Sequence, residues 1–300
     1  MVHHYACPLC SAEKILIHLN CRDYFLSGEP FALFKCSDCG FVFTQDYPEA
    51  HAIGSYYESD EYLSHNDSSK GFSDRIYRLA RNFMLHRKKR MITKITRLKK
   101  GKLLDIGSGS GHFAATMKNA GWQVTGIEIN EKARNLSESK HGLEILDPKK
   151  INTLKTASFD CITLWHVLEH FHEPFEYYAE IMRLLKPGGI CVTALPNCNS
   201  YDARHYREFW AAYDVPRHLW HFTPSSFAIF SKKTGFMTEK IMNLPADVFY
   251  ISFVSEKYKE SSLPFLRGII RAKFYAIGSF FRKEKSSSII YILRKPADNL

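Results

Sequence analysis

Short apolar runs and helical stretches alternate between residues 103 and 195, and this alternation constrains the fold more than any other feature. The runs have the length and composition of buried strands, and the segments between them carry apolar residues at helical spacing. Repeated units of strand, helix and strand are typical of a mostly parallel sheet covered by helices. We therefore expect an α/β fold. The predicted strands are 103–106, 123–129, 143–146, 159–165 and 190–195, and the predicted helices are 112–120, 131–139 and 175–185.

Further elements extend this core in both directions. Apolar residues recur at helical spacing over residues 72–98, which predicts an amphipathic helix before the first strand. Another helix begins after Thr223, a residue type that caps helix N-termini. The last two strands are predicted at 236–244 and 288–294, so that one domain over 72–300 carries insertions at about 198–222 and 245–286.

Four cysteines near the amino terminus form two C-x-x-C pairs, Cys7 with Cys10 and Cys36 with Cys39. Two such turns flanking a hairpin supply the four thiolates of a closed tetrahedral site, which suits structural zinc. A unit as small as residues 1–45 buries too little surface to fold unaided, so a metal is physically reasonable. We expect a zinc-ribbon-like module here, followed by a linker or lid over residues 46–71.

Charge and targeting signals set limits on location and partners. The net charge is +10, and residues 72–102 hold twelve Lys and Arg against one acid. Such a concentration fits an anionic partner such as lipid, nucleic acid or a phosphorylated substrate, and it equally fits a solvated helix face. The amino terminus lacks a charged-then-apolar signal pattern, and no apolar run is long enough to cross a membrane. We expect a cytoplasmic protein.

A glycine-rich turn with the pattern D-x-G-x-G-x-G follows the strand at 103–106. Its glycines let backbone amides approach an anionic group at the start of the next helix. The dinucleotide pattern G-x-G-x-x-G would require glycine where this chain has His112. Glu128 ends the next strand along the chain, and an acid there accepts hydrogen bonds from a ribose diol. The pair of features predicts a nucleoside-containing cofactor with an anionic tail.

These features together resemble the class I S-adenosylmethionine-dependent methyltransferases. The segment W-H-V-L-E-H at 165–170 and the segment 214–219 are similar to the ubiquinone-biosynthesis-type branch, which acts on small molecules. The resemblance covers about residues 73–295. It implies a Rossmann-like seven-stranded sheet of order 3-2-1-4-5-7-6 with the last strand antiparallel, and S-adenosylmethionine as cofactor. The implied cofactor contacts are Asp105, Gly107, Ser108, Gly109, Gly111, Glu128, Ile129, Asp147, Trp165 and His166.

Methyl transfer needs an in-line approach and a deprotonated acceptor, and histidine suits the role of general base near neutral pH. His166 and His218 are the candidate bases, with Glu169 and Asp214 as orienting or alternative acids. For each of these four residues taken alone, a structural role is the simpler interpretation. The segment 166–170 also matches the zinc-protease pattern H-x-x-E-H, which we reject because it begins at the end of a buried strand. The candidate substrate contacts are Tyr213, Arg217, His218 and His221.

Three functions are compatible with these features. The first is methyl transfer to an oxygen or carbon atom of a small molecule such as a sugar, lipid or natural-product intermediate. The second is RNA methylation through the zinc module and the basic helix, against which the helix lacks regularly interleaved aromatic residues. The third is a non-catalytic binding module with a vestigial cofactor fold. We also expect that the basic, aromatic segment 245–286 contacts an anionic membrane, unless it forms ordinary helices packed beside the sheet.

Overall fold

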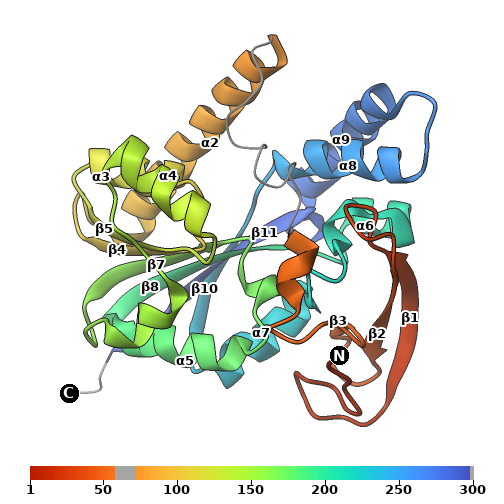
Figure 1. Cartoon of the computed structure of the whole chain (residues 1–300), viewed down its shortest axis with the longest axis horizontal. Helices are drawn as coiled ribbons and strands as arrows, with labels where there is room; N and C mark the ends of the chain where they lie inside the picture. Colours follow the sequence, from red (N-terminus) through yellow and green to blue (C-terminus); the bar gives the residue numbers. More distant parts are fainter. Residues whose placement is uncertain (58–71, 298–300) are drawn as a thin grey trace.

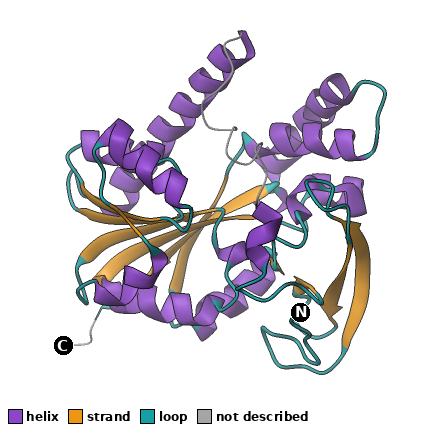
Figure 2. Cartoon of the chain, viewed as in Figure 1, coloured by secondary structure: helices purple, strands orange, loops and turns teal. Residues whose placement is uncertain are grey.

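A central sheet crosses the molecule in the order β10-β11-β8-β7-β4-β5-β6 (Figures 1 and 2). The computed structural model describes residues 1–57 and 72–297. The five strands from β6 to β8 are parallel, and β11 runs antiparallel to both β8 and β10. The strands are β4 (Lys102–Ile106), β5 (Gln123–Ile127), β6 (Ile145–Leu146), β7 (Phe159–Trp165), β8 (Leu185–Pro196), β10 (Met237–Asn243) and β11 (Ser288–Arg294).

Helices cover both faces of this sheet (Figure 2). Leu103 and Cys161 pack on one face with residues of α2 and α3, while Leu104 and Ile162 pack on the other with residues of α5 and α7. Because alternate strand residues point to opposite faces, strands buried on both sides must be apolar throughout. The helices are α2 (Phe72–Thr96), α3 (His112–Asn119), α4 (Glu131–His141), α5 (Pro174–Leu184) and α7 (Pro224–Lys233).

The strand order confirms the predicted sheet, since numbering its strands along the chain gives 3-2-1-4-5-7-6 with the last strand antiparallel. Most element boundaries agree within two residues, and two strands differ more. The strand predicted at 190–195 begins at Leu185, directly after α5, so the Lys186–Gly189 turn lies inside β8. The strand predicted at 143–146 is reduced to the two residues of β6.

The amino-terminal module contains β1 (Ile15–Arg22), β2 (Pro30–Cys36) and β3 (Val42–Thr44), and its sheet has a fourth strand from far along the chain. This strand, β9 (Trp220–His221), pairs antiparallel with β3. The module therefore shares its sheet with the insertion predicted at 198–222. Of the predicted linker or lid, residues 53–57 form a short 3-10 helix, η1 (Ile53–Tyr57), and residues 58–71 lie outside the described residues.

The two insertions are mostly helical. The first carries α6 (Tyr201–Tyr206) and two short 3-10 helices, η4 (Arg207–Phe209) and η5 (Ala211–Tyr213). The second forms a hairpin of α8 (Asp247–Tyr258) and α9 (Pro264–Phe281) that extends from the sheet, as α2 does (Figure 1). Within the described part of the chain, no helix combines the length and apolarity needed to cross a bilayer.

Candidate functional site

The glycine turn after β4 has a left-handed backbone at each of its three glycines. A Cβ added at Gly107 would lie 2.3 Å from Val167, and one at Gly111 would lie 2.0 Å from the Ser137 hydroxyl. A Cβ at Gly109 would meet nothing within 4 Å, although its φ of +52° is similar. Gly107 and Gly111 are thus required by packing, whereas Gly109 borders open space where a ligand can approach the backbone.

Polar groups surround this open space. The Glu128 carboxylate accepts hydrogen bonds from the backbone amides of Gly109 (2.8 Å) and Asn130 (2.9 Å), which fixes it at the end of β5. Helix α3 has no side-chain N-cap, so its first amides remain available to an anionic group. The Ser108 hydroxyl and the Trp165 indole nitrogen are buried without a hydrogen-bond partner among the described residues.

Asp105 is buried beneath the turn and accepts a 2.7 Å hydrogen bond from the Thr163 hydroxyl. Burial raises the pKa of Asp105 to about 7, against the opposing effect of Thr163. Two other predicted cofactor residues lie at the rim. The side chain of Ile129 is 81% exposed, and Asp147 caps the 3-10 helix η2 (Pro148–Thr153). The cofactor roles of all these residues stay predictions.

Lys88 is a cation in this crevice that the sequence analysis did not single out. It lies on α2, and its Nζ is 3.9 Å from the centre of the Trp165 ring, within range of a cation–π contact. Burial lowers the pKa of Lys88 to about 8, against the attraction of Asp247 and Asp105. An ammonium at this position can bind a carboxylate that approaches the first turn of α3.

The segment after β7 joins the glycine turn to a second polar group. His166 has a left-handed φ of +57° at the end of β7, and its Nε2 lies 2.9 Å from the Asp247 carboxylate on α8. Its Nδ1 lies 3.5 Å from Glu169 Oε1. Burial opposes the charged ring, but these two acids outweigh burial and raise the pKa of His166 to about 10. A ring already protonated at neutral pH cannot serve as a base there, so the geometry favours other histidines.

Glu169, His170 and His218 form the second polar group, with one possible ligand atom from each lying within 4.8 Å of the others. Nδ1 of His170 lies 3.0 Å from the Arg217 carbonyl oxygen, and Nδ1 of His218 lies 2.9 Å from that of Ala212. Because a carbonyl oxygen only accepts, the contact of His218 with Ala212 places the hydrogen on Nδ1 and leaves Nε2 with a free lone pair. Nδ1 of His170 lies 2.9 Å from the Tyr57 hydroxyl as well, and a hydroxyl can donate or accept, so the carbonyl alone does not fix the tautomer of His170.

The Glu169 carboxylate is fully buried, and neither of its oxygens has a hydrogen-bond partner among the described residues. Burial opposes its ionisation, but His166 outweighs burial and holds the pKa of Glu169 below its usual value. Burial and the neighbouring His218 lower the pKa of His170 to about 4. Imidazole nitrogens beside a carboxylate can accept a proton from a ligand, and these three side chains are also a donor set that suits a divalent cation.

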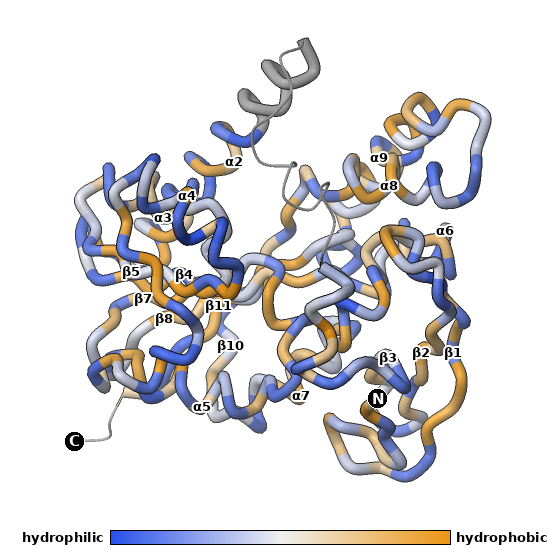
Figure 3. Tube along the Cα trace, viewed as in Figure 1, coloured by the Kyte–Doolittle hydropathy of each residue, from blue (hydrophilic) through white to orange (hydrophobic). Residues whose placement is uncertain are grey.

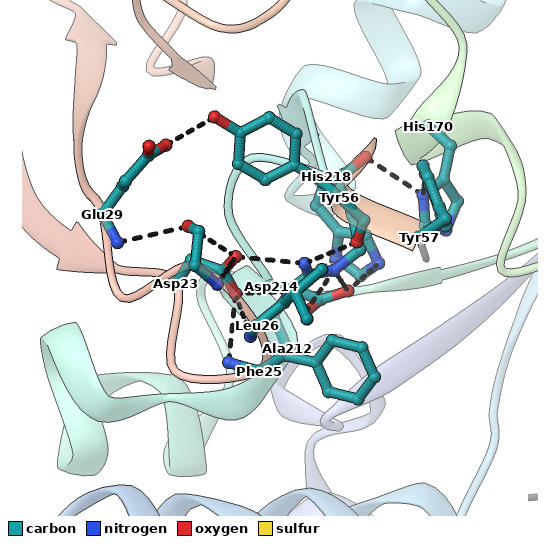
Figure 4. A network of polar contacts seen from close by, with 12 residues as sticks. Asp23, Phe25, Leu26, Glu29, Tyr56, Tyr57, His170, Ala212, Asp214 and His218 are labelled. Carbon is teal, nitrogen blue, oxygen red and sulfur yellow. Dashed lines mark hydrogen bonds and ion pairs between the residues drawn. The ribbon is translucent and has the colours of Figure 1, made fainter. Parts of the chain in front are cut away.

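Arg217, a predicted substrate contact, is engaged by two of the protein's own acids. Both acids, Asp23 and Asp214, are labelled in the polar network of Figure 4. The Arg217 guanidinium binds Asp23 of the amino-terminal module and Asp214, with 2.7 Å contacts to each, and it donates to the Tyr56 carbonyl oxygen. The Arg217 side chain is 2% exposed. Burial opposes ionisation, but Arg217 holds the pKa of both acids below its usual range. The arrangement ties the module and η1 to the loop that carries His218.

The remaining predicted substrate contacts are buried. Tyr213 and His221 pack edge to face with ring centres 5.2 Å apart. His221 Nε2 also lies 3.0 Å from the Thr44 hydroxyl of β3. Asp214 Oδ2 lies 3.9 Å from His218 Nε2. The insertion predicted at 198–222 therefore packs against the amino-terminal module, and of the predicted substrate contacts only His218 joins the group around Glu169.

The four cysteines of the two C-x-x-C turns converge as predicted. The Sγ atoms of Cys7 and Cys39 lie 3.6 Å apart, as do those of Cys10 and Cys36. These separations exclude disulfides, which need about 2.05 Å, and they approach the edge of about 3.8 Å of a tetrahedron with Zn–S bonds of about 2.3 Å. The four donors are therefore placed for a closed metal site, with no position left for chemistry.

Comparison with known proteins agrees with this geometry. The family model described as a methyltransferase domain matches residues 77–241, more than half of the chain. The chain belongs to the methyltransferase domain family. This membership supports S-adenosylmethionine as the ligand of the glycine crevice.

Curated relatives include ubiquinone biosynthesis O-methyltransferases. That of Thiobacillus denitrificans is 35% identical over 95 residues, covering 29% of this chain and 41% of the relative. That of Aromatoleum aromaticum is 27% identical over 157 residues, covering 48% of this chain and 67% of the relative. The chain thus spans about two fifths of the length of the first of these relatives. A solved structure of a candidate sarcosine dimethylglycine methyltransferase from Galdieria sulphuraria shares the fold, with a TM-score of 0.50, 16% identity and coverage of 73% of this chain and 86% of that one.

Sequence analysis placed Glu169 and His218 as candidates but missed two other residues. Lys88 stands among Met84, Met91 and Ile92, so its position on the apolar side of the predicted helix was a usable signal. For His170 the sequence left pocket lining, helix capping and acid/base work open, and the structure places it beside Glu169 and His218. Asp247 had no signal, because it lies 81 residues from His166 in the chain.

Proposed function

We propose that this protein transfers a methyl group from S-adenosylmethionine to an oxygen or carbon atom of a small molecule. The observation that carries the proposal is the convergence of His170 and His218 on the buried Glu169 carboxylate, close to Val167, which packs on the glycine turn. The names of the relatives support a small-molecule acceptor over RNA, and the intact crevice argues against a non-catalytic module.

The residues of the crevice fit this cofactor. Gly109 would admit its amino-acid end to the backbone, Lys88 would bind its carboxylate, and Glu128 would accept hydrogen bonds from its ribose. Trp165 would line the pocket beside Lys88. The cofactor supplies an electrophilic methyl group on a sulfonium, so the protein's own contribution is orientation and deprotonation of the acceptor.

Glu169, His170 and His218 would activate the acceptor. An acceptor hydroxyl or carbon acid placed against the two Nε2 atoms would lose its proton to one of them, and the adjacent carboxylate would stabilise the imidazolium that forms. A divalent cation held by the same three residues would instead lower the pKa of a bound hydroxyl. Asp247 and His166 would position Glu169 in either case.

The first experiment identifies the acceptor. The protein is incubated with methyl-labelled S-adenosylmethionine and fractionated cell extract, and the labelled product is isolated. Label in a small molecule that survives ribonuclease treatment supports the proposal. Label that is lost with ribonuclease would assign RNA as the acceptor, and absence of any transfer with intact cofactor binding would leave a binding module.

The second experiment tests the acceptor site with that substrate. We expect His218→Gln and His170→Gln each to lower kcat by about 10²- to 10⁴-fold with unchanged cofactor affinity. His172→Gln is the matched control, because its ring binds the Pro48 carbonyl oxygen outside this group. Activity that a chelator abolishes while elemental analysis shows the zinc of the cysteine cluster retained, and that one added cation restores, would assign the metal route. A pH profile that flattens in the variants would assign the base. Undiminished kcat in both variants would refute the site.

The cysteine cluster leads to a separate proposal, that Cys7, Cys10, Cys36 and Cys39 hold a structural zinc ion. Support comes from the four convergent sulfur atoms and from the small core available to three short strands. The ion would order the module whose strand β3 pairs with β9. Its stoichiometry can be measured by elemental analysis of the purified protein.

A further inference from the structure

Helix α9 carries a long stripe of exposed apolar side chains. Leu266, Ile270, Phe274, Ile277 and Phe281 recur at spacings of three and four residues, which places them on one helix face. Their exposed fractions are 52%, 46%, 69%, 60% and 79%. We call these five residues the α9 stripe. Figure 3 shows the hydrophobic character of this helix at the outer part of the hairpin. A continuous apolar face of this size on a surface helix indicates a binding surface.

The opposite face of α9 explains why the stripe points outward. Gly268, Ala272 and Ser279 are buried on that face. A Cβ at Gly268 would lie 2.8 Å from the backbone of Phe253 in α8, and one at Gly278 would lie 2.8 Å from the Tyr201 ring of α6. Small residues therefore let α9 pack closely on its neighbours, and the large apolar residues of the stripe face away from α6 and α8 and stay exposed.

The charges around the stripe are mostly positive. Helix α9 contains Arg267, Arg271 and Lys273 and no acid. Arg267 and Arg271 form ion pairs with Glu256 of α8, so two cations share one anion. Lys273, Arg282 and Lys283 are exposed beside the stripe or just after it, and Glu284 is exposed next to Lys283. The surface next to the exposed aromatic residues therefore carries a net positive charge.

We propose that the α9 stripe docks on an anionic lipid bilayer, with the helix lying in the plane of the interface. An apolar face inserted at the headgroup boundary and flanked by lysine and arginine is the combination that binds peripheral helices to such membranes. Eighteen residues give a contact about 27 Å long. The hairpin begins at Asp247, which binds His166, so docking would orient the acceptor side of the site toward the lipid surface.

Charge complementarity selects lipid over a second copy of the chain. Two α9 stripes packed together would bring the basic residues of both helices into one interface, and the helix offers no carboxylate to pair with them. Anionic headgroups supply that missing charge. The proposal does not depend on the identity of the methyl acceptor, since binding is measured without turnover.

The test is sedimentation of the full chain with vesicles of phosphatidylcholine containing about 30% phosphatidylglycerol, compared with pure phosphatidylcholine, at low salt and again near 0.5 M salt. We expect at least about tenfold stronger partition onto the anionic vesicles, and loss of this preference at high salt. The double variant Phe274→Ser/Phe281→Ser should weaken partition by about tenfold or more. Phe83→Ser is the matched control, because Phe83 of α2 is 66% exposed and lies outside the stripe.

The outcomes separate the occupants of the stripe. Binding that requires both anionic lipid and the two phenylalanines supports the proposal. Absence of binding at low salt, or equal binding by wild type and double variant, overturns it. A wild-type dimer in analytical ultracentrifugation that the double variant dissociates would assign the stripe to a second copy and also overturns it. Circular dichroism of each variant checks that the exposed substitutions leave the fold intact.

Discussion

Replacing Gly109 by alanine should weaken cofactor binding while leaving the fold in place. The added Cβ meets no protein atom within 4 Å, so its effect on the folded chain comes from the left-handed φ of +52° alone. That conformation costs an L-residue about 1–2 kcal/mol. In a chain of this size the cost corresponds to a decrease in Tm of about 2–4 °C per kcal/mol.

The effect on the cofactor should be larger, because the methyl group occupies the space through which a ligand reaches the backbone. We expect at least a tenfold increase in the Kd for S-adenosylmethionine, or about 1.4 kcal/mol. Isothermal titration calorimetry measures the affinity, and thermal denaturation measures the stability. Gly111→Ala should act mainly on the fold, because its Cβ would lie 2.0 Å from the Ser137 hydroxyl. We expect this variant to lose more thermal stability than Gly109→Ala.

Gly188→Ala provides the matched control. Gly188 also has a positive φ, +71°, and an added Cβ there would meet nothing within 4 Å, but the residue lies in the turn at the start of β8. Both variants should lose similar stability, and only Gly109→Ala should lose affinity. If Gly109→Ala binds the cofactor as tightly as wild type and Gly188→Ala do, the glycine crevice is not the cofactor site. Glu128→Ala tests the same crevice from its other side and should also weaken binding.

Three further predictions follow from the buried charges and the cysteine cluster. Lys88→Met should weaken cofactor binding about tenfold, and Lys88→Arg should restore it because it keeps the positive charge. Since the pKa of Lys88 is about 8, the affinity of the wild-type protein for the cofactor should fall as the pH rises above 8. Calorimetry at several pH values measures this affinity. Asp23→Asn should cost about 1.5–3 kcal/mol in urea unfolding, because it removes charged hydrogen bonds to the buried Arg217 while Asp214 stays paired with it. The pKa values of Asp23 and Asp214 are lowered in the folded protein, so these acids contribute to the free energy of unfolding above pH about 4, and the contribution is lost as the pH falls. The free energy of unfolding of Asp23→Asn should therefore decrease less on acidification than that of the wild type. Cys36→Ser should abolish zinc in elemental analysis and lower Tm, whereas Cys161→Ser, a buried cysteine outside the cluster, should lower Tm and keep the zinc.

The parts of the fold that could be predicted from the sequence depend on local patterns. Residues 103–106 and 159–165 are apolar on both faces, which requires a sheet covered on both sides, and that sheet fixes where Gly107 and His166 emerge. The C-x-x-C pairs likewise predicted their own convergence, because each turn presents two sulfur atoms to one point. In each case the information lies within a few neighbouring residues.

The parts that were missed depend on contacts between distant residues. Asp23 binds Arg217 across 194 positions, and neither residue type indicates the other in a basic chain of this length. Arg217 was therefore predicted to hold a substrate, whereas the structure pairs it internally. The pairing of β9 with β3 was missed for the same reason, since two residues such as Trp220 and His221 carry no periodicity.

That pairing has a consequence for the chemistry of the site. Thr44 of β3 donates a 2.7 Å hydrogen bond to the His218 carbonyl oxygen, and its amide donates to the Leu219 carbonyl oxygen. The Leu219 amide in turn donates to the Glu169 carbonyl oxygen at 2.8 Å. His218 is thus held against Glu169 by a strand of the amino-terminal module. General-base catalysis requires a hydrogen-bond distance between the base and the acceptor. If the amino-terminal module becomes less ordered without its metal, His218 should shift, and the rate of methyl transfer should fall before the affinity for the cofactor does. The cysteine cluster is thus connected to His170 and His218 through the paired strands β3 and β9.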